Sequence, residues 1–502
     1  MDTEKRLYPR GMTYARCLLS SLFALGLCSA CHQITRQNAV RQDTRPNVVW
    51  FMADDLGWGE LGCYGQDKIR TPRVDRLAAE GMLFKQHYSG APVCAPARCV
   101  LMTGMHSGHA HVRGNFEIGG WGDDDGEGQL PLPEGTATLP ALLQAAGYAT
   151  CAVGKWGLGG PDTSGEPNRQ GFDHWFGYLC QRQAHNQYPT HLWRNGERVD
   201  LPGNVWKNLT GEHYAHDLMV EEILSWIRDH VDEPFFVYVP FHIPHAAIQV
   251  PQDSLDEYEG VFDDDPPYMG DKGYLPHPTP RAAYAAMVTR MDRDVGRIVD
   301  LLQELGLREN TLVAFSSDNG PTFNGGTDST FFESAAHFRG LKGSVHEGGL
   351  RVPLVVSWPG VVRAGSQTRH LCAFQDVMPT LLDLAGVPVP DDLDGISFAP
   401  TLRGKGTQPE HEALYFEFPS YGGQQAVRTR RWKLVRRGLL EGESTLALYD
   451  MQADESEAVD LAARHPEVVK RLMAIAQREH RPSEHFPFPA LDPRTVSEEE
   501  SP

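Results

Sequence analysis

Short apolar runs, each followed by polar residues, recur along the chain. They read NVVWFMADD (47–55), YATCAVGKW (148–156), PFFVYVPFH (234–242), TLVAFSSDNG (311–320) and PLVVSWPG (353–360). Continuous apolar runs of this length are typical of strands that are buried on both faces of a parallel sheet. Helical patterns over 215–231 and 282–306 separate them. The alternation predicts an α/β fold with a doubly wound, mostly parallel sheet flanked by helices.

The pattern changes after a Pro- and Asp-rich stretch at 387–395. Beyond residue 410, the runs EALYFEF, AVRTRRWKLVRR and TLALYDM precede the helix-like HPEVVKRLMAIAQ. We therefore predict an α/β domain over 46–388 and a smaller C-terminal α+β subdomain over 410–490 that contains an antiparallel sheet. The polar residues 491–502 are typical of a disordered tail.

The N-terminus has the pattern of an export signal. Four basic residues precede the apolar stretch CLLSSLFALGLCSAC, which ends at Cys31. We predict a signal peptide over 1–31, because the stretch is short for a membrane span. Its end also resembles a bacterial lipoprotein cleavage site, so a lipid anchor and an uncleaved anchor stay as alternatives. We expect the protein to be exported and to be periplasmic, secreted or lipid-anchored at a bacterial cell envelope.

Charge and cysteine content narrow the classes of partner. The formal net charge of −20 argues against broad binding of nucleic acid, which requires many Lys and Arg side chains. An anionic substrate would need local cations instead. Cysteines 63, 94, 99, 151, 180 and 372 follow the leader without a CxxC pair, so we expect one or two disulfides at most.

Two pairs of oxygen-bearing residues end apolar runs: Asp54–Asp55 and Asp318–Asn319. Such pairs are often helix caps or turns. However, the carboxyl ends of parallel strands meet at one edge of a sheet, where ligands bind in open α/β folds. Oxygen ligands without a thiolate or imidazole cluster favour Ca²⁺, and less strongly Mg²⁺, over zinc.

Cationic residues and one cysteine accompany these pairs. Arg98, Lys155 and Lys342 are either solvated surface charges or ligands for an anionic ester. Cys94 is a buried thiol, a disulfide partner or a nucleophile, and no neighbouring base identifies it as an activated thiol.

The stretch Cys94-Ala95-Pro96-Ala97-Arg98, followed by VLMTGMHSGH, resembles the signature of type I sulfatases, which belong to the alkaline phosphatase superfamily. The resemblance continues through NVVWFMADDLGWGELGCYG, GKWGLGG, FHIPHAAI, SSDNG, GLKGSVHEGGLRVP and AVRTRRWKLV. It implies that a formylglycine-generating or other sulfatase-maturing enzyme oxidises Cys94 to formylglycine (3-oxoalanine). Ala97 replaces the commoner serine.

The same resemblance implies the roles of the remaining residues. Asp54, Asp55, Asp318 and Asn319 would bind Ca²⁺ together with an oxygen of the modified residue 94. Arg98, Lys155 and Lys342 would contact the sulfate or the formylglycine. A hydroxyl of the hydrated aldehyde would attack sulfur, and His245, assisted by Lys342, is the candidate acid for the leaving alcohol.

One position departs from the family pattern. Many sulfatases have a histidine two residues after the lysine that corresponds to Lys155, whereas Gly157 stands here. His185 and His242 are candidates to replace it, although a single histidine is more often a structural hydrogen-bonding group. Among other histidines, His106, His109 and His111 lack a complete zinc pattern, which favours a structural role.

The substrate is less closely defined by the sequence. The insertion 159–195 contains Arg182, His185, His191 and Trp193, side chains that suit sugar hydroxyls, charge and ring stacking. We expect Arg182, His185 and His242 to bind substrate, and we expect a sulfated carbohydrate or aryl ester. The alternatives are a phosphate or phosphonate monoester hydrolase of the same superfamily, and a noncatalytic sulfoglycan-binding protein with unmodified Cys94.

Overall fold

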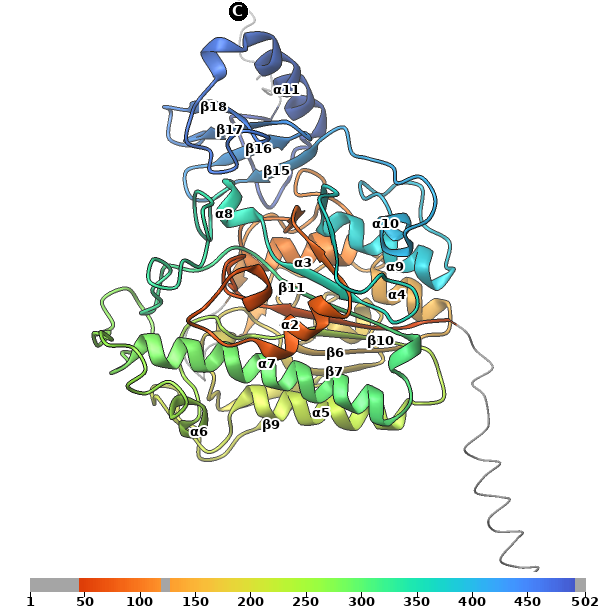
Figure 1. Cartoon of the computed structure of the whole chain (residues 1–502), viewed down its shortest axis with the longest axis vertical. Coiled ribbons are helices and arrows are strands. Elements are labelled where there is room, and N and C mark those ends of the chain that lie inside the picture. The colour runs from red at the N-terminus through yellow and green to blue at the C-terminus, as the bar shows by residue number, and fades with distance from the viewer. Residues whose placement is uncertain (1–44, 119–126, 493–502) are drawn as a thin grey trace, which may run out of the picture. The chain divides into compact units, whose positions relative to one another are not determined.

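The computed structural model describes residues 45–118 and 127–492 (Figure 1). The predicted leader, the acidic residues 119–126 and nearly all of the predicted tail therefore lie outside the described residues. Both sheets described below belong to one compact unit, Arg45–Pro502, so the predicted division at 388 and 410 stays a prediction.

A ten-stranded mixed sheet forms the centre of the fold. Its strands follow one another in space as β13 (Ser366–Thr368), β2 (Met82–Phe84), β12 (Leu354–Ser357), β11 (Thr311–Ser317), β1 (Asn47–Ala53), β10 (Phe235–Pro240), β6 (Ala149–Lys155), β7 (His174–Tyr178), β8 (His191–Arg194) and β9 (Glu197–Asp200). The five strands from β11 to β7 are parallel to one another. The predicted α/β fold is thus confirmed, although β12, from the run at 353–360, pairs antiparallel with β11.

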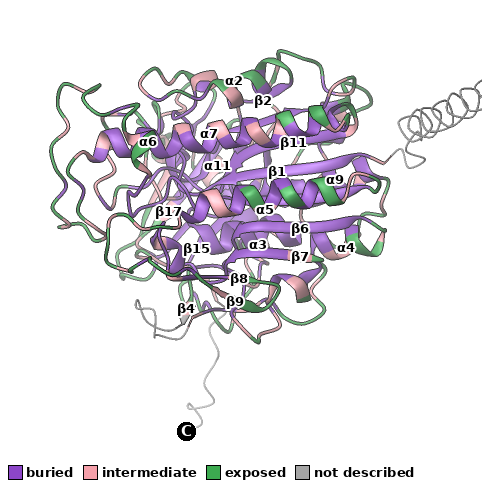
Figure 2. Ribbon diagram, turned by 90° about the horizontal axis from the view of Figure 1, so that it is seen from below, coloured by how far each residue is buried: buried purple, intermediate pink, exposed green. Residues whose placement is uncertain are grey.

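Helices cover both faces of the sheet. One face packs against α2 (Pro72–Ala79), α5 (Ala215–Asp229) and α7 (Pro280–Glu304). The opposite face packs against α3 (Cys94–Thr103), α4 (Leu139–Ala145), α9 (Val377–Ala385) and α10 (Ala399–Arg403). Strand β1 is buried along its whole length, as its unbroken apolar sequence requires. Figure 2 shows exposed stripes on α5 and α7 and buried central strands between the helices.

The C-terminal antiparallel sheet is smaller, and Figure 1 shows it with its helix at the top of the molecule. Its strands are consecutive in the chain: β15 (Leu414–Phe418), β16 (Gln424–Arg428), β17 (Trp432–Arg437) and β18 (Thr445–Asp450). Helix α11 (Pro466–Glu479) packs on one face through Leu472, Ile475 and Ala476. The other face contacts α8 (Glu347–Leu350) and the segment before Cys94.

The remaining elements are short. They are β3 (His87–Tyr88) paired with β14 (Cys372–Ala373), β4 (Glu117–Ile118) paired with β5 (Gly128–Gln129), α6 (Gln252–Leu255), and the 3₁₀ turns η1 (Gly62–Tyr64), η2 (Pro167–Gln170), η3 (Gln183–His185), η4 (Arg308–Asn310), η5 (Phe374–Asp376) and η6 (Ala462–Arg464). Among the described residues, no helix has the length and the apolar content needed to cross a bilayer.

Candidate active site

Acidic side chains gather where β1 and β11 end. Asp54 and Asp55 follow β1, and Asp318 and Asn319 follow its neighbour β11. The side-chain amide of Asn319 donates to Asp55 Oδ1 over 2.7 Å, and the backbone N–H of Asp55 donates to Asp318 Oδ1 over 3.1 Å. All four residues are fully buried. The parallel register of β1 and β11 therefore brings together residues that are more than 260 positions apart in the chain.

Cys94 contacts this cluster as the first residue of α3. Its thiol lies 3.4 Å from Asp54 Oδ1. Pro96 is tolerated in the first helical turn because N–H groups there have no partner within the helix. Arg98 follows Cys94 by four residues, so both side chains leave the helix on the same face.

Three cations surround the carboxylates. Arg98 donates to Asp318 Oδ2 over 2.8 Å from Nη2, and another guanidinium nitrogen donates to the carbonyl of Lys155. Lys155 is the last residue of β6, and its Nζ lies 2.5 Å from Asp54 Oδ2 and 3.8 Å from Cys94 Sγ. The ammonium of Lys342 lies 2.8 Å from Asp55. The structure thus brings together three acids, three cations and Cys94.

The surroundings shift the pKa values of the acids unequally. Burial raises the pKa of Asp318 to about 6, and Asp54 adds to this shift although Arg98 opposes it. Burial likewise raises the pKa of Asp55 despite the charge of Lys342. Burial opposes ionisation of Asp54 as well, but Lys155 and the other nearby cations hold its pKa well below the usual range. Three buried carboxyl groups therefore lie together, and burial makes the ionisation of Asp55 and Asp318 less favourable even beside the lysines and the arginine.

The donor set fits a hard divalent cation. Asp54, Asp55 and Asp318 offer carboxylate oxygens, and Asn319 Oδ1 is buried without a hydrogen-bond partner among the described residues. Ligand atoms of Asp54, Asp55, Cys94 and His245 also lie within 4.8 Å of one another. A buried oxygen without a donor is costly, and oxygen-rich sites of this kind suit Ca²⁺.

Histidines approach the acidic cluster from the segment that follows β10. His245 Nε2 lies 3.5 Å from Asp55 Oδ2, and His245 Nδ1 contacts the carbonyl of Ala246. The ring of His185 stacks on that of His245 with centroids 4.7 Å apart. Tyr274 packs edge-on against both rings. Sequence analysis missed Tyr274 because it lies in an irregular loop without a recognisable motif.

The other two residues expected to bind substrate differ in their surroundings. His242 is fully buried beside Tyr178, with ring centroids 5.0 Å apart, and neither ring nitrogen has a hydrogen-bond partner among the described residues. Burial lowers the pKa of His242, and the neighbouring His216 adds to the shift. Arg182 instead forms an ion pair with Glu117 over 3.0 Å. His191 and Trp193 likewise contact Glu127.

The remaining cysteine and histidine clusters have structural surroundings. All six described cysteines are free thiols, so the one or two disulfides that the sequence allows are absent from the part of the chain that the structure describes. His109 Nδ1 lies 2.9 Å from Asp394. His106 Nε2 lies 3.3 Å from Glu479, and His106 Nδ1 accepts from the N–H of Gly108. Because these nitrogens already have partners, a structural role accounts for them.

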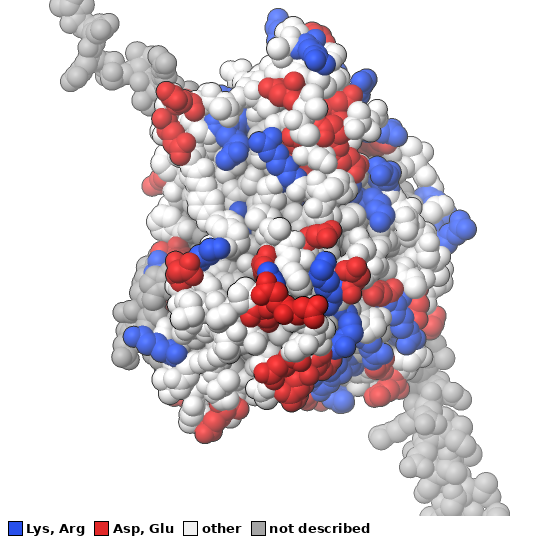
Figure 3. Space-filling model, turned by 60° about the vertical axis from the view of Figure 1, so that its left-hand side comes forward, with Lys and Arg blue, Asp and Glu red and all other residues white. Residues whose placement is uncertain are grey.

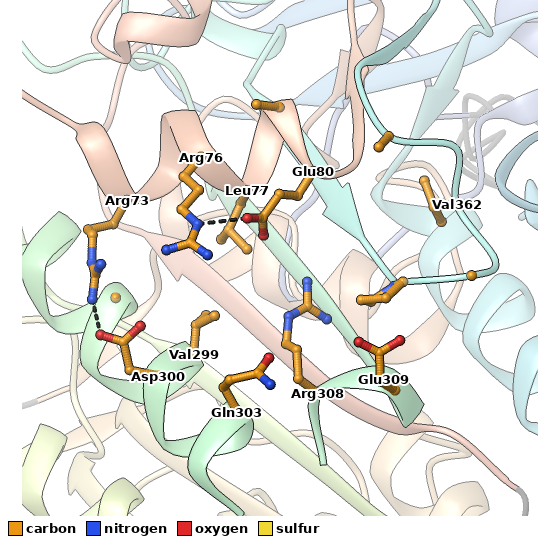
Figure 4. A pocket seen from close by; sticks show the side chains of 15 residues that line it. Arg73, Arg76, Leu77, Glu80, Val299, Asp300, Gln303, Arg308, Glu309 and Val362 are labelled. Atoms are coloured by element: carbon orange, nitrogen blue, oxygen red, sulfur yellow. Dashed lines mark hydrogen bonds and ion pairs between the residues drawn. The ribbon is translucent and has the colours of Figure 1, made fainter. Parts of the chain in front are cut away.

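A separate cavity of about 530 Å³ lies between α2 and α7 (Figure 4). Its arginines already have partners: Arg73 contacts Asp300, Arg76 Nε lies 2.7 Å from Glu80, and Arg308 donates to the Thr311 carbonyl and the Ser357 hydroxyl. No residue of the strand-end cluster lines it. Over the face in Figure 3, acidic and basic side chains are intermixed, whereas Arg98 and Lys155 are buried. The buried cluster is therefore the candidate site for an anionic ester.

Comparisons with known proteins agree with this geometry. Residues 46–387 match the family model described as Sulfatase, and residues 340–480 match the model described as N-sulphoglucosamine sulphohydrolase, C-terminal. The N-acetylgalactosamine-6-sulfatase of Homo sapiens is 29% identical over 86% of this chain and 85% of its own. The N-acetylgalactosamine-6-O-sulfatase of Bacteroides thetaiotaomicron is 28% identical over 92% of this chain and 98% of its own.

A solved structure extends the similarity. The protein called Ps i-CgsB, which has also been solved in complex with k-i-k-neocarrahexaose, superposes with a TM-score of 0.72 at 26% identity. The match covers 87% of this chain and 94% of that protein. With a family model that matches more than half of its length, the chain belongs to the sulfatase family and is an arylsulfatase-like sulfuric ester hydrolase.

Proposed function

We propose that this sulfatase removes sulfate from a carbohydrate at the buried cluster where β1, β6, β10 and β11 end. One observation carries the proposal: Arg98, Lys155 and Lys342 converge with three carboxylates on Cys94 at the start of α3. A sulfate ester carries one negative charge that it cannot lose near neutral pH. Preorganised cations in a buried site can hold such an anion and stabilise the charge that develops on its oxygens.

Residue 94 and a calcium ion would supply the nucleophile. When present, the hydrate of the formylglycine made from Cys94 would offer a hydroxyl for attack on sulfur, and bound Ca²⁺ would lower the pKa of that hydroxyl. Asp54, Asp55, Asp318 and Asn319 would hold the ion, which would give a partner to the buried Asn319 oxygen that has none among the described residues. The start of α3 adds a favourable dipole for negative charge at position 94.

The chain's own residues would divide the remaining tasks. Arg98 and Lys155 would bind sulfuryl oxygens and hold the ester against residue 94. Lys342 and His245 both point toward Asp55 and are the proposed proton donors to the leaving alcohol. Burial lowers the pKa of His245, and the charge of Lys342 lowers it further. A bound anion would raise the pKa again, so His245 would gain its proton when substrate is present.

The surroundings of His245 favour a sugar. A cavity of about 260 Å³ beside it is lined by His185, Asn186, Trp206, Lys207, Ala247, Gly273, Tyr274 and Leu275. Trp206 and Tyr274 offer ring surface, and Lys207 offers a cation for a further acidic group of a glycan. The loop that carries Trp206 is fixed by Asn186, whose side chain donates to the Trp206 carbonyl over 2.6 Å.

The C-terminal sheet contributes a further aromatic group. Tyr421 is 65% exposed, and its ring would lie 2.2 Å from a Cβ placed on Gly343, the residue after Lys342. The N–H of Gly343 in turn donates to the carbonyl of Pro92, two residues before Cys94. We propose that Tyr421 stacks on a sugar ring at the mouth of the site.

Matched substrates test this proposal. We expect the protein, once mass spectrometry shows that the peptide with residue 94 carries the aldehyde, to hydrolyse sulfated sugars and aryl sulfates much faster than the corresponding phosphate esters. A preference for phosphate or phosphonate esters would favour that alternative. A cysteine that stays unmodified when the chain is produced with a maturing enzyme, together with glycan binding but no turnover, would favour a binding protein.

The cell location follows from the leader rather than from the folded part. We propose export by residues 1–31, with a periplasmic, secreted or lipid-anchored product at a bacterial cell envelope, and membrane attachment only through a lipid on Cys31. A sulfatase-maturing enzyme would be the protein partner. Labelling with a radioactive fatty acid in wild-type and Cys31→Ala chains distinguishes the lipid-anchored form.

A further inference from the structure

The side-chain amide of Gln181 is buried without a hydrogen-bond partner. The residue is 1% exposed, and neither Oε1 nor Nε2 has a partner among the described residues. Its backbone N–H, in contrast, donates to Gln129 Oε1 over 3.2 Å. Because a buried amide normally pairs both of its polar atoms, this amide requires a polar partner, a water or a ligand, that the described residues do not supply.

Gln181 lies next to the strand end that carries Lys155. Strands β6 and β7 are parallel, and their pairing continues past the sheet, because the N–H of Gly157 donates to the carbonyl of Leu179 over 3.0 Å. Gly157 follows Lys155 by two residues. The carbonyl of Lys155 accepts from Arg98, the cation that contacts Asp318. The Gln181 amide therefore belongs to the same edge of the sheet as the candidate active site.

The glycine at position 157 makes room for this amide. Its φ is +85°, a left-handed conformation that favours glycine. A Cβ at this position would lie 1.7 Å from Gln181 Nε2 and 2.8 Å from Gln181 Cδ. Any side chain at residue 157 would occupy the space that the amide now fills. Gly157 and Gln181 are thus a matched pair, in which the segment after β7 supplies a polar group that residue 157 does not.

We propose that the Gln181 amide is a hydrogen-bonding ligand of the sulfate group in the active site. Its NH₂ group would donate to a sulfuryl oxygen, and its carbonyl would accept from a hydroxyl next to the sulfur. An amide neither gains nor loses a proton near neutral pH, so Gln181 orients the reacting group and does not act as an acid or base. This inference rests on the proposed sulfatase function. It assigns the place beside Gly157 to Gln181 rather than to His185 or His242.

The test compares two buried glutamines of different surroundings. Gln181→Leu removes an amide without protein partners. Gln170→Leu is the control, because Gln170 is 2% exposed and its Nε2 donates to the carbonyl of Ser164 over 2.8 Å, although its Oε1 has no partner among the described residues. Loss of a paired amide destabilises a protein, whereas loss of an unpaired one does not. We expect Gln170→Leu to melt at a lower temperature with unchanged kcat/KM.

For Gln181→Leu we expect the opposite: a melting temperature that is equal or higher, with kcat/KM lowered by about tenfold or more. Inorganic sulfate gives a readout that does not depend on turnover. Its dissociation constant, taken from the shift in melting temperature of Cys94→Ala protein, should rise about tenfold when Gln181→Leu is added.

Unchanged sulfate affinity and unchanged kcat/KM in Gln181→Leu would overturn the inference, whatever its stability. Should Gln181→Leu fold poorly, Gln181→Asn shortens the side chain by one methylene and is judged by the same sulfate affinity. A wild-type protein that neither binds sulfate nor hydrolyses any sulfate ester would instead refute the proposed function.

Discussion

A buried ion cluster joins the C-terminal sheet to the loop that carries Lys342, and we predict how much stability is lost when its lysine is replaced. Lys433 on β17 is fully buried, with Nζ 2.9 Å from Glu347 Oε1 and 3.0 Å from Glu457 Oε1. Glu347 begins α8, five residues after Lys342. The substitution Lys433→Met preserves most of the side-chain volume but removes the charge, so both glutamates lose their shared partner.

The size of the effect follows from burial. Removing one member of a buried pair costs about 3–5 kcal/mol, because the other charge stays uncompensated. Arg351 and Arg428 remain 3.3 and 4.0 Å from Glu347, which favours the lower end of that range. With an unfolding entropy of about 2.1 cal/mol/K per residue over about 450 residues, a loss of about 3 kcal/mol lowers the melting temperature by about 3 °C.

Thermal melting and sulfatase kinetics measure the two consequences. We expect Lys433→Met to melt about 3 °C lower and to show a several-fold lower kcat/KM, because Lys342 loses the support of α8. Adding Glu457→Gln should restore part of the stability by removing one uncompensated carboxylate. Lys470→Met, at an exposed position of α11, is the control and should change neither quantity. If Lys433→Met melts at the same temperature as the wild type, the cluster does not stabilise the contact between the C-terminal sheet and α8.

Four further predictions concern the site and its pH range. Asp318→Asn should lower bound calcium per chain, measured by elemental analysis, and kcat/KM by about 10² or more; full calcium retention would contradict the proposed ligand set. Cys94→Ala should abolish turnover of aryl sulfates while leaving the melting temperature nearly unchanged, so activity within tenfold of wild type would exclude a nucleophile at position 94. Burial opposes ionisation of Glu347, but Lys433 and two arginines lower its pKa from 4.5 to about 2. Its ionised form therefore contributes about 3 kcal/mol to the free energy of unfolding above pH 4.5, and this contribution is lost as the pH falls toward 2. If the melting temperatures of wild type and Glu347→Gln fall in parallel over this range, Glu347 makes no such contribution. Tyr421→Ala should raise KM for a sulfated oligosaccharide but not for a small aryl sulfate, while Tyr421→Phe should behave like the wild type; equal KM values for all three proteins would exclude stacking.

The sequence predicts those parts of the fold and site that follow from local pattern. Apolar runs such as 47–53 identify buried strands, and a parallel sheet places the residues that follow them at one edge. This reasoning anticipates that Asp54 and Asp318 lie close together. It also applies to Lys155, because β6 is parallel to β10, which is parallel to β1, so all three strands end at the same edge of the sheet.

Other parts depend on contacts between segments that no local pattern links. Tyr274 approaches His245 from an irregular loop, and Gln181 reaches the position beside Gly157 only because β6 and β7 are adjacent. Arg182 has the right charge for an anionic substrate, yet Glu117 pairs with it. The direction of β12 is likewise not predicted from the sequence, since its apolar run does not reveal that it pairs antiparallel with β11.

The geometry of α3 explains why the cysteine motif tolerates alanine at position 97. Cys94 and Arg98 are one turn apart and face the acidic cluster, where Arg98 contacts Asp54, Asp318 and the carbonyl of Lys155. Ala97 lies on another side of the helix and packs within the hydrophobic core. A serine hydroxyl at this position would need a buried hydrogen-bond partner, whereas alanine needs none. Ala97 therefore makes none of the contacts by which residues 94 and 98 meet the acidic cluster, and alanine is compatible with them.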